Sequence, residues 1–521
     1  MATRFLWIWL GFTVFASSPA FADTSIAGLV KDATGKTLHG VFVSAKRDGS
    51  VATTTVYSDD AGTFHFAGLA EGLYVVTARA GGFQSSQRSH VAVKVGKVTK
   101  LVFSLEVETR PAELLKQSTG WEWLASLPGT MEQKLSLAKN CDGCHHNVYQ
   151  LRDYRFTKED WAKIVSAMER IDVIGETPGR SAPRWVHGSK DDIAAYLAEV
   201  QGPAIVLPKI QFSPRPTGKA THAVITEYQI PRGNAVPHDV YVDAQGNAWY
   251  NDFKADYLGK LNPKNDEFKE YKLPSKAGVH PGSEEMFIDP DQNIWIGERL
   301  AKRFLRFDPQ KEEVTGIYDN AKFVRVDTQR GVALGVENQM DLKTGEIKRY
   351  QYKSSIASYG NGYAIDASGM AYIPGWTHES VIRMLNPETG DVTNFPTPTP
   401  DAAPRRLSLG ADNNIWFGEW YGGKIGKLDL QTKTITEYDV SDPFAVIYQA
   451  NMDPQNHTVW TYDWVSDREI RLDPKTGEMT EYPMPTLDVE SRRTAFDPAA
   501  SIPTMWIHDA GNGELIRIQI Q

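Results

Sequence analysis

The chain has 521 residues, of which 41% are hydrophobic and 23% are charged, so it is long enough for several domains of ordinary globular composition. Its formal net charge is -9 and no run of lysine and arginine stands out, which makes nucleic acids and anionic membranes poor partners. Only two cysteines are present, and both lie in one short motif, which indicates a dedicated chemical use rather than a disulfide framework.

Residues 1–22 have the pattern of a secretory signal peptide. Arg4 precedes an apolar run over residues 5–16, and Ala20-Phe21-Ala22 supplies small residues before the expected cleavage site. The run is too short to span a bilayer, and no later stretch of about 18 apolar residues follows it. We therefore expect an exported, periplasmic protein without a membrane span, with a retained N-terminal anchor as the alternative.

Residues 23–105 alternate between apolar and polar positions, with Asp- and Gly-rich turns, which predicts a small β-sandwich. The segments that carry a resemblance are Gly28-x-Val30-x-Asp32-x-x-Gly35, Asp60-Ala-Gly-Thr-Phe64, Leu69-x-x-Gly72-x-Tyr74 and Ala80-Gly-Gly-Phe83. They resemble the carboxypeptidase regulatory-like (transthyretin-like) domains. The resemblance implies a non-catalytic spacer, with glycan or partner binding as the alternative.

Residues 106–205 change to a helical pattern. Thr157-Lys-Glu-Asp160 and Ser189-Lys-Asp-Asp192 have the form of capping boxes, each opening one amphipathic helix. A further helix is expected to run from Met131 into the cysteines. The Pro-bearing stretch that follows Gly202 reads as a linker.

Within this helical segment, Cys141-Asp-Gly-Cys144-His145 has the C-x-x-C-H spacing of c-type haem attachment. Two thiols on one helical turn can form thioethers with the haem vinyl groups, and the next histidine can ligate the iron. A redox dithiol would need a thioredoxin-like βαβ context, and a zinc site would need a second pair of cysteines. The segment therefore predicts one covalent haem c and resembles the small class I cytochromes.

The second axial ligand of the iron is expected to be Met168, because Trp161-x-x-Ile-Val-x-x-Met168 is similar to the segment after the haem in exported monohaem cytochromes. A methionine would give a higher-potential electron-transfer haem. His187 and His146 are the alternatives, and Met168 could instead be a core residue of an amphipathic helix.

Residues 206–521 contain an internal repeat built from a strand, a turn with Asp or Asn, and an aromatic residue. Successive repeat aromatics are separated by 46, 77, 44, 44 and 46 residues, starting at Trp249 and ending at Trp506. The gap of 77 predicts a degenerate copy between Tyr318 and Arg349. Seven units of about 44 residues indicate a seven-bladed β-propeller.

The two ends of the repeat predict how the ring closes. The last unit stops after residues 514–520, which match a third strand, and the missing fourth strand is similar to residues 225–231 at the start. Pairing these two segments in one blade would leave no long open edge. The overall prediction is a mainly β multidomain protein that contains a small β-sandwich, a small α-helical cytochrome c domain and a seven-bladed β-propeller.

Alignment of the repeats predicts which side chains line the central channel. Five positions before each repeat aspartate, or its equivalent, stand His238, Glu284, Asn361, Arg405, Tyr448 and Arg492. Three positions after the aromatics stand Asp252, Glu298, Glu419, Asp463 and Asp509. The candidate catalytic residues are His238, Asp252, Glu284, Arg405 and Arg492. Carboxylates that only cap neighbouring turns are the alternative for the acidic set.

The segments Pro237-His-Asp-Val240, Trp416-Phe-Gly-Glu419 and Ile225-Thr-Glu-Tyr228 resemble the streptogramin (virginiamycin B) lyases. The resemblance implies a seven-bladed propeller, ester opening by proton abstraction and a divalent cation at the propeller mouth. His238 and Asp252 match the family's His and Glu in form. The late blade offers Arg492 and Asp509 instead of its histidine, so we expect no base there.

The favoured function is haem electron transfer coupled to a substrate at the propeller mouth, with a second periplasmic carrier as partner. Arg405 and Arg492 suggest that this substrate is a small organic anion. The competing functions are a carbon–oxygen lyase with accessory haem and a non-enzymatic electron-transfer or scaffold protein. No Rossmann glycine motif, P-loop or nucleophile elbow supports another class.

Overall fold

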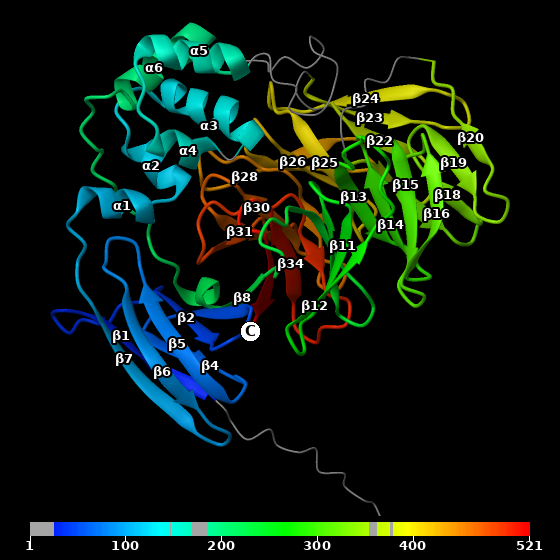
Figure 1. Cartoon of the computed structure of the whole chain (residues 1–521). Coiled ribbons are helices and arrows are strands. Elements are labelled where there is room, and N and C mark those ends of the chain that lie inside the picture. The colour runs from blue at the N-terminus through cyan, green and yellow to red at the C-terminus, as the bar shows by residue number, and fades with distance from the viewer. Residues whose placement is uncertain (1–24, 146, 169–185, 354–361, 376–378) are drawn as a thin grey trace, which may run out of the picture.

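The computed structural model describes residues 25–145, 147–168, 186–353, 362–375 and 379–521. It is mainly β, as the sequence predicts, with an N-terminal β-sandwich, six helices α1–α6 and a ring of four-stranded sheets (Figure 1). The expected signal peptide lies outside the described residues. Within the described ranges, no helix is long and apolar enough to cross a membrane.

The N-terminal sandwich packs two sheets around one apolar core, which includes Val30, Val43, Val76 and Phe103. Alternation in strands such as Thr63–Phe66, where only every second residue is buried, turns one face of each sheet inward. The first sheet contains β4 (Thr63–Phe66), β1 (Ser25–Asp32) and β7 (Val98–Leu105). The second contains β3 (Ala52–Tyr57), β2 (Phe42–Arg47), β5 (Gly72–Arg79) and β6 (Ser86–Val93).

The helical segment follows directly. Its helices are α1 (Pro111–Gln117), α2 (Gly120–Ser126), α3 (Met131–His145), α4 (Asn147–Asp153), α5 (Lys158–Met168) and α6 (Lys190–Val200). The three helices expected from the sequence correspond to α3, α5 and α6. Ser189 and Asp192 form the predicted reciprocal capping box at the start of α6. At α5, Thr157 Oγ1 accepts a hydrogen bond from Asp160 N at 3.3 Å.

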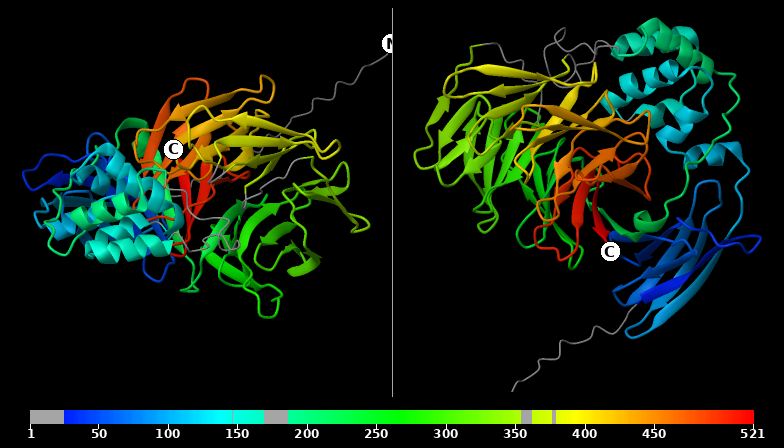
Figure 2. Two further views of the ribbon diagram at one scale, coloured as in Figure 1. Left: turned by 90° about the horizontal axis from the view of Figure 1, so that it is seen from above. Right: turned by 180° about the vertical axis from the view of Figure 1, so that it is seen from behind.

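Seven four-stranded blades surround a central channel, and each is described below from its innermost to its outermost strand (Figures 1 and 2). Blade one contains β9 (Pro237–Val242), β10 (Ala248–Asp252), β11 (Tyr257–Asn262) and β12 (Glu267–Lys272). Blade two contains β13 (Ser283–Ile288), β14 (Ile294–Glu298), β15 (Arg303–Asp308) and β16 (Glu313–Asp319). Blade three contains β17 (Arg325–Asp327), β18 (Val332–Leu334), β19 (Asn338–Asp341) and β20 (Ile347–Arg349), which is the predicted degenerate copy.

The later blades follow the same order. Blade four contains β21 (Ala364–Ile365), β22 (Ala371–Pro374), β23 (Val381–Leu385) and β24 (Val392–Pro396). Blade five contains β25 (Pro404–Leu409), β26 (Ile415–Glu419), β27 (Lys424–Leu428) and β28 (Ile435–Asp439). Blade six contains β29 (Asn451–Met452), β30 (Val459–Asp463), β31 (Arg468–Leu472) and β32 (Met479–Pro483).

Blade seven closes the ring with strands from both ends of the repeat. It contains β33 (Ala495–Phe496), β34 (Thr504–Asp509), β35 (Glu514–Ile520) and β8 (Ala223–Gln229), which follows the short 3-10 helix η1 (Gly218–His222). The antiparallel pairing of β8 with β35 aligns Ile225 with Ile518, as the sequence predicts. This closure joins the two ends of the ring by backbone hydrogen bonds.

The outer edge of β8 is paired as well. Strand β3 of the N-terminal domain aligns antiparallel with it, Thr54 opposite Thr226, so blade seven and one sheet of the sandwich form a continuous sheet of eight strands. The sandwich and the propeller, which are separated in the chain by the helical segment, are therefore joined directly by backbone hydrogen bonds between β3 and β8.

A hydrogen bond from the repeat aromatic to the repeat aspartate explains the spacing between them. The indole nitrogen of Trp249 donates to Asp243 Oδ2 at 2.8 Å, and Trp295 donates to Asp289 Oδ2 at 2.8 Å. The same aspartates accept backbone N–H groups of their turns, as Asp243 does from Asn247 N at 2.9 Å. The pair thus fixes the turn between the first two strands of a blade.

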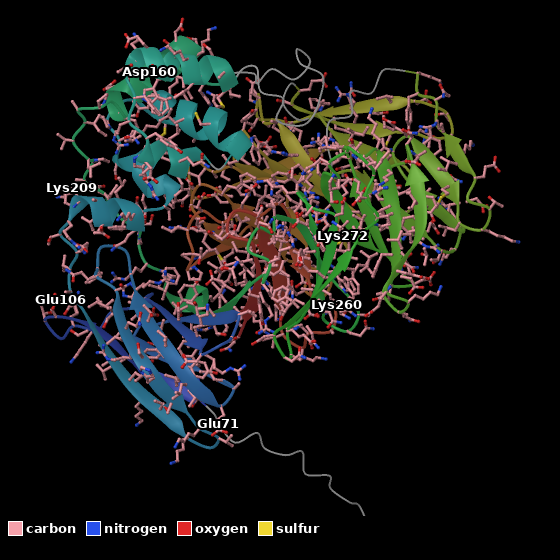
Figure 3. All side chains as sticks on the ribbon, viewed as in Figure 1. Glu71, Glu106, Asp160, Lys209, Lys260 and Lys272 are labelled. Carbon is pink, nitrogen blue, oxygen red and sulfur yellow. The ribbon has the colours of Figure 1, made fainter. Side chains whose placement is uncertain are left out.

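The helical segment packs on blades five and six. Trp161 and Ile193 share one apolar cluster with Trp420 and Val446 of the propeller. Trp121 N donates to Val465 O at 2.8 Å, and buried Lys139 donates to Ala445 O. Figure 3, in which the side chains are drawn, shows labelled charged residues such as Asp160 at the periphery of this region.

Candidate functional site

One end of the channel, which we call the mouth, is where the first strand of each blade begins and the second strand ends. His238 and Asp239 lie at the start of β9, Glu284 at the start of β13, and Arg405 at the start of β25. Arg492 stands just before β33. The register shifts between Ser283 and Glu285 and between Arg405 and Ser408, so strict strand alternation is broken at the mouth.

A buried ion-pair cluster crosses the channel behind the mouth. Arg406 Nη2 lies 2.7 Å from Asp239 Oδ2, with both side chains 0% exposed, and Arg493 Nε lies 3.1 Å from the same oxygen. Burial alone would raise the pKa of Asp239, but Arg406 and Arg493 hold it well below its usual range. The carboxylate therefore stays ionised and ties blade one to blades five and seven.

The same Arg406 guanidinium also binds backbone. Its Nη1 donates to Arg492 O at 2.9 Å, and its Nη2 lies 3.3 Å from Glu284 O. Further along the channel, later positions of the first strands line a cavity of about 300 Å³ whose walls include Tyr241, Tyr363 and Asn451. The Arg406 cluster thus stands between this inner cavity and the mouth.

Two histidine rings lie side by side at the mouth. The ring centroids of His238 and His508 are 6.5 Å apart with an interplanar angle of 16°. His508 Nε2 accepts a hydrogen bond from Arg492 N at 3.2 Å, which leaves the proton on Nδ1. Burial lowers the pKa of His238 to about 3 and that of His508 well below its usual value. Both rings are therefore neutral at pH 7.

Next to the histidines, two arginines stack on an aromatic cluster. The Arg405 guanidinium lies 4.3 Å from the Trp420 ring centroid and 3.9 Å from that of Tyr448, and Arg492 lies 5.7 Å from Trp464. The three aromatic rings contact one another, with 4.9 Å between the centroids of Trp420 and Trp464. Packing against these rings orients the guanidinium groups as donors.

The Arg492 side chain pairs with Glu490, but its Nη1 is buried without a hydrogen-bond partner among the residues that the structure describes. Burial lowers the pKa of Arg492 to about 10, with the neighbouring Arg405 also acting in that direction. The group is still charged at neutral pH. A buried, charged donor without a full set of partners is suited to an anionic ligand.

The remaining predicted residues differ in their surroundings. Glu284 lies at the mouth and forms an ion pair with Arg299, whose Nε is 2.8 Å from Glu284 Oε1. Asp252 is fully buried, forms an ion pair with Arg232 and accepts N–H groups from Lys254 and Ala255 at 2.8 and 2.9 Å. Since its oxygens are engaged in a turn, we leave Asp252 out of the proposed site. The predicted channel residue Asn361 lies outside the described residues.

Other members of the acidic set also serve turns. Asp509 accepts N–H groups from Gly511 and Asn512, and Asp463 accepts them from Val446 and Val465. Within the described ranges, no group of three or more His, Cys, Asp and Glu side chains could hold a metal ion. These residues therefore offer no set of ligands for the divalent cation that the resemblance implies at the mouth.

Four mouth residues were missed by the sequence interpretation: Asp239, Arg406, Arg493 and His508. Asp239, Arg406 and Arg493 each directly follow a residue that was predicted, and the pairs 405–406 and 492–493 are arginine doublets. Strand alternation would turn one residue of each pair away. In the late blade, where the sequence predicts no base, His508 lies one position before the aligned Asp509, and its Nε2 is occupied by the hydrogen bond from Arg492 N.

The haem-attachment motif occupies the last two turns of α3. Positions 141, 144 and 145 fall within one continuous helix, and residues three and four apart share a helical face. Cys141 is half-buried against the shared apolar cluster. The donor set of two cysteines and one histidine in this order fits covalent haem c. Met168, the last residue of α5, is half-buried.

The segment that carries His187 lies beside α3. Asn140 Nδ2 donates to His187 O at 2.9 Å, and Val186 N donates to Asn140 Oδ1 at 2.8 Å. Asn140 immediately precedes the first cysteine. Burial, with a contribution from Lys139, lowers the pKa of His187, so its ring is predominantly neutral at pH 7 and able to ligate a metal.

Comparison with known proteins gives two domain matches. Residues 25–106 match the carboxypeptidase regulatory-like domain, and residues 343–512 match the virginiamycin B lyase family. These matches confirm the two resemblances drawn from the β-rich parts of the sequence. No curated protein sequence matches the chain.

Among solved structures, a streptogramin B lyase is 18% identical with a TM-score of 0.49, covering 58% of this chain and 100% of the lyase. Virginiamycin B lyase from Staphylococcus aureus is 20% identical with a TM-score of 0.48, covering 57% of this chain and 100% of the enzyme. A catalytically inactive variant of the Staphylococcus aureus enzyme with quinupristin is 21% identical, with a TM-score of 0.48 and the same coverage.

Proposed function

We propose that this chain is a periplasmic oxidoreductase in which a covalent haem c serves a small anionic organic substrate bound at the propeller mouth. One observation carries the proposal. Helix α3, which bears the C-x-x-C-H motif, packs on the propeller within the same apolar cluster as Trp420, Tyr448 and Trp464. These are the rings on which the mouth arginines stack. The haem motif and the mouth therefore belong to neighbouring parts of one packed unit.

The residues that would hold the haem are Cys141 and Cys144 through thioethers, with His145 as a ligand of the iron. Met168 is proposed as the second iron ligand, and the contacts of Asn140 with residues 186 and 187 support His187 as the alternative. The bound haem supplies one-electron transfer, to be passed on to a second periplasmic carrier.

At the mouth, Arg405 and Arg492 would bind the acidic group of the substrate and fix its orientation. His238 has its Nδ1 3.3 Å from Asp239 Oδ1, a geometry that favours a proton on Nδ1 and leaves Nε2 as an acceptor. Because the ring is neutral, Nε2 can accept a hydrogen bond from a substrate hydroxyl and orient it. Glu284 and its partner Arg299 complete the wall beside it.

The haem assignment predicts that replacing either cysteine changes how haem is held. In Cys144→Ala and Cys141→Ala variants, haem is expected to lose one thioether, shifting the absorption band of the pyridine complex to longer wavelength. The double variant is expected to release its haem on acid–acetone extraction. Met168→Ala serves as a control, since it should keep both thioethers. A wild-type protein without covalent haem would refute the assignment.

The mouth assignment predicts that Arg492→Gln abolishes substrate-driven reduction. Oxidised full-length protein is mixed under anoxia with organic hydroxy acids, phenolates and alcohols, and its visible spectrum is followed. We expect an anionic compound to reduce the wild-type protein. In Arg492→Gln this reduction should be at least about 100-fold slower, because the variant loses a charged contact worth roughly 3 kcal/mol. Arg330→Gln, at an arginine about half exposed, is the matched control. Reduction unaffected by Arg492→Gln would refute the site.

The second candidate function is a carbon–oxygen lyase, favoured by the match over residues 343–512 together with the neutral His238–His508 pair. In this case a lactone ester would open while the haem spectrum stays unchanged. Loss of that opening in His508→Ala, and dependence on an added divalent cation, would distinguish the lyase from the oxidoreductase.

A further inference from the structure

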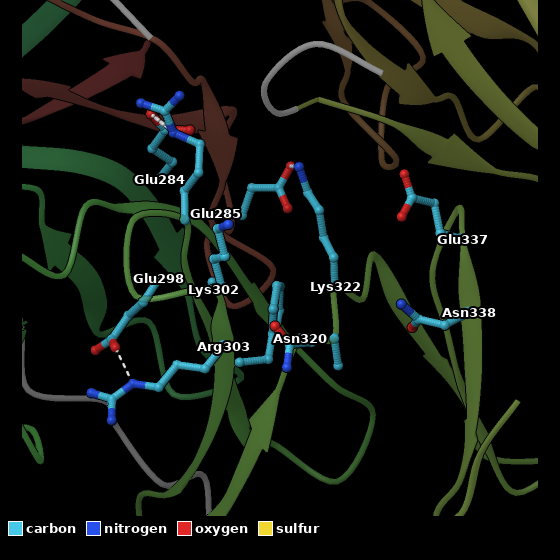
Figure 4. A pocket seen from close by; sticks show the side chains of 13 residues that line it. Glu284, Glu285, Glu298, Lys302, Arg303, Asn320, Lys322, Glu337 and Asn338 are labelled. Atoms are coloured by element: carbon cyan, nitrogen blue, oxygen red, sulfur yellow. Dashed lines mark hydrogen bonds and ion pairs between the residues drawn. The ribbon is translucent and has the colours of Figure 1, made fainter. Parts of the chain in front are cut away.

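A second cavity opens on the mouth side between blades two and three. Its volume is about 260 Å³. Charged side chains form its rim, and Gly297, Phe304 and Ala321 contribute an apolar wall. Figure 4 shows Glu285 and Lys322 meeting between Glu298 on one side and Asn338 on the other.

Most charges around this cavity are already neutralised. Arg299 pairs with Glu284 at 2.8 Å, Lys322 Nζ lies 3.5 Å from Glu285 Oε1, and Arg303 pairs with Glu298. A simple cation or a simple anion would therefore meet a nearly balanced lining. The cavity is better matched to a neutral polar group.

Two buried acceptors in the lining have no partner among the residues that the structure describes. Asn338 is 2% exposed, and its Oδ1 accepts no hydrogen bond from the described residues. Glu298 is 1% exposed, and its Oε1 likewise accepts none from them. Exposed Lys302 adds donors at the rim. Hydroxyl groups are the ligand groups that satisfy acceptors and donors together, because each can donate and accept.

The cavity adjoins the mouth through Arg406. The Arg406 guanidinium donates to the backbone oxygens of Glu284 and Arg492. Glu284 belongs to the cavity wall, and Arg492 is the arginine whose Nη1 has no partner among the described residues. The two backbone positions are thus held by adjacent nitrogens of a single side chain. Glu284, which lines the cavity, also interacts electrostatically with Arg492, so the Arg492 side chain lies near the cavity.

We propose that the cavity between blades two and three binds the polyhydroxylated part of a sugar acid whose carboxylate pairs with Arg492. The carboxylate part rests on the proposed function, whereas the hydroxyl part rests on the cavity alone. The apolar wall at Phe304 and Ala321 takes the C–H face of the carbon chain, and the acceptors on Asn338 and Glu298 take its hydroxyls.

The test is calorimetric titration of full-length, haem-loaded protein at pH 7 with gluconate, glucose and benzoate. We expect gluconate to bind at least about 10-fold more tightly than either of the others. Ala321→Leu, which fills the cavity, should weaken gluconate at least about 10-fold and leave benzoate unchanged. Ala367→Leu, at an exposed alanine in the first turn of blade four, is the control.

A second variant guards against misfolding at position 321. Lys302 is exposed with φ +52°, a conformation that glycine adopts without strain, so Lys302→Gly should fold normally. It should weaken gluconate about 3- to 10-fold through the lost ammonium donors. Unchanged gluconate affinity in both variants would overturn the proposal.

The probes also separate this inference from the proposed function. Binding of benzoate but not gluconate, lost in Arg492→Gln, would overturn the cavity proposal and leave the anion site standing. Gluconate and glucose binding equally, weakened by Ala321→Leu but not by Arg492→Gln, would support the hydroxyl site and overturn the carboxylate pairing. No binding by any of the three probes would overturn the sugar-acid proposal.

Discussion

Replacing Arg406 with methionine is expected to lower the free energy of unfolding of the propeller by about 3–5 kcal/mol. Asp239 is 0% exposed and its Oδ2 is bonded to Arg406 at 2.7 Å, so the variant leaves a buried carboxylate with Arg493 as its remaining cationic partner. The carbonyl groups of Glu284 and Arg492 also lose a donor. Urea unfolding followed by tryptophan fluorescence would measure the change.

The matched control removes both charges. Asp239→Asn combined with Arg406→Met eliminates the buried carboxylate, so it should recover at least about 1–2 kcal/mol of the loss. Arg330→Met, at an arginine about half exposed, should stay within about 0.5 kcal/mol of the wild type. An Arg406→Met protein as stable as the wild type would show that Arg406 does not hold the mouth together.

The propeller could be predicted because its repeat has a local physical cause. The hydrogen bonds from Trp249 to Asp243 and from Trp295 to Asp289 each fix a turn within one blade. The spacing between the aspartate and the tryptophan is therefore constant and can be recognised in the sequence. The ring closure could be predicted for a related reason. A third-strand pattern at residues 514–520 lacked its fourth strand, and the matching segment stood at the start.

The continuous sheet between domains could not be predicted. Strand β3 alternates like any sandwich strand, and nothing in residues 52–57 specifies β8 as a neighbour, because backbone pairing at an edge depends on position rather than on side-chain identity. The packing of the helices on blades five and six could not be predicted from the sequence either. Trp161 and Trp420 share one apolar cluster, and nothing in the sequence pairs them.

The mouth was predicted in part. Repeat alignment located His238, Glu284, Arg405 and Arg492, since one position in each blade faces the channel. It assigned Asp252 to the chemistry, although this side chain bonds to Arg232 and to backbone N–H groups of its turn. Arg406 was missed because the register shift between Arg405 and Ser408 breaks the two-residue alternation at the start of β25.

Glu469→Gln is expected to stabilise the protein above pH 8 by on the order of 3–5 kcal/mol. Glu469 is 0% exposed, its Oε1 accepts from Thr494 at 2.9 Å, and burial raises its pKa to about 8. The folded protein therefore binds this proton more tightly than the unfolded chain does. Stability from this group is fully present below about pH 4.5 and is lost as pH rises toward 8 and beyond.

Glutamine keeps the acceptor for Thr494 and never ionises, so the variant should remove this part of the pH dependence. Its stability should lie within about 1 kcal/mol of the wild type at pH 5 and exceed it at pH 9. Glu478→Gln, on the same blade but exposed, should leave the pH profile unchanged. Thermal unfolding of the three proteins between pH 5 and 9 would measure this, and parallel wild-type and Glu469→Gln profiles would contradict a raised pKa. Glu469 lies in β31, in a blade on which the helices pack. We therefore expect the contact between α3 and the propeller to weaken as well at high pH.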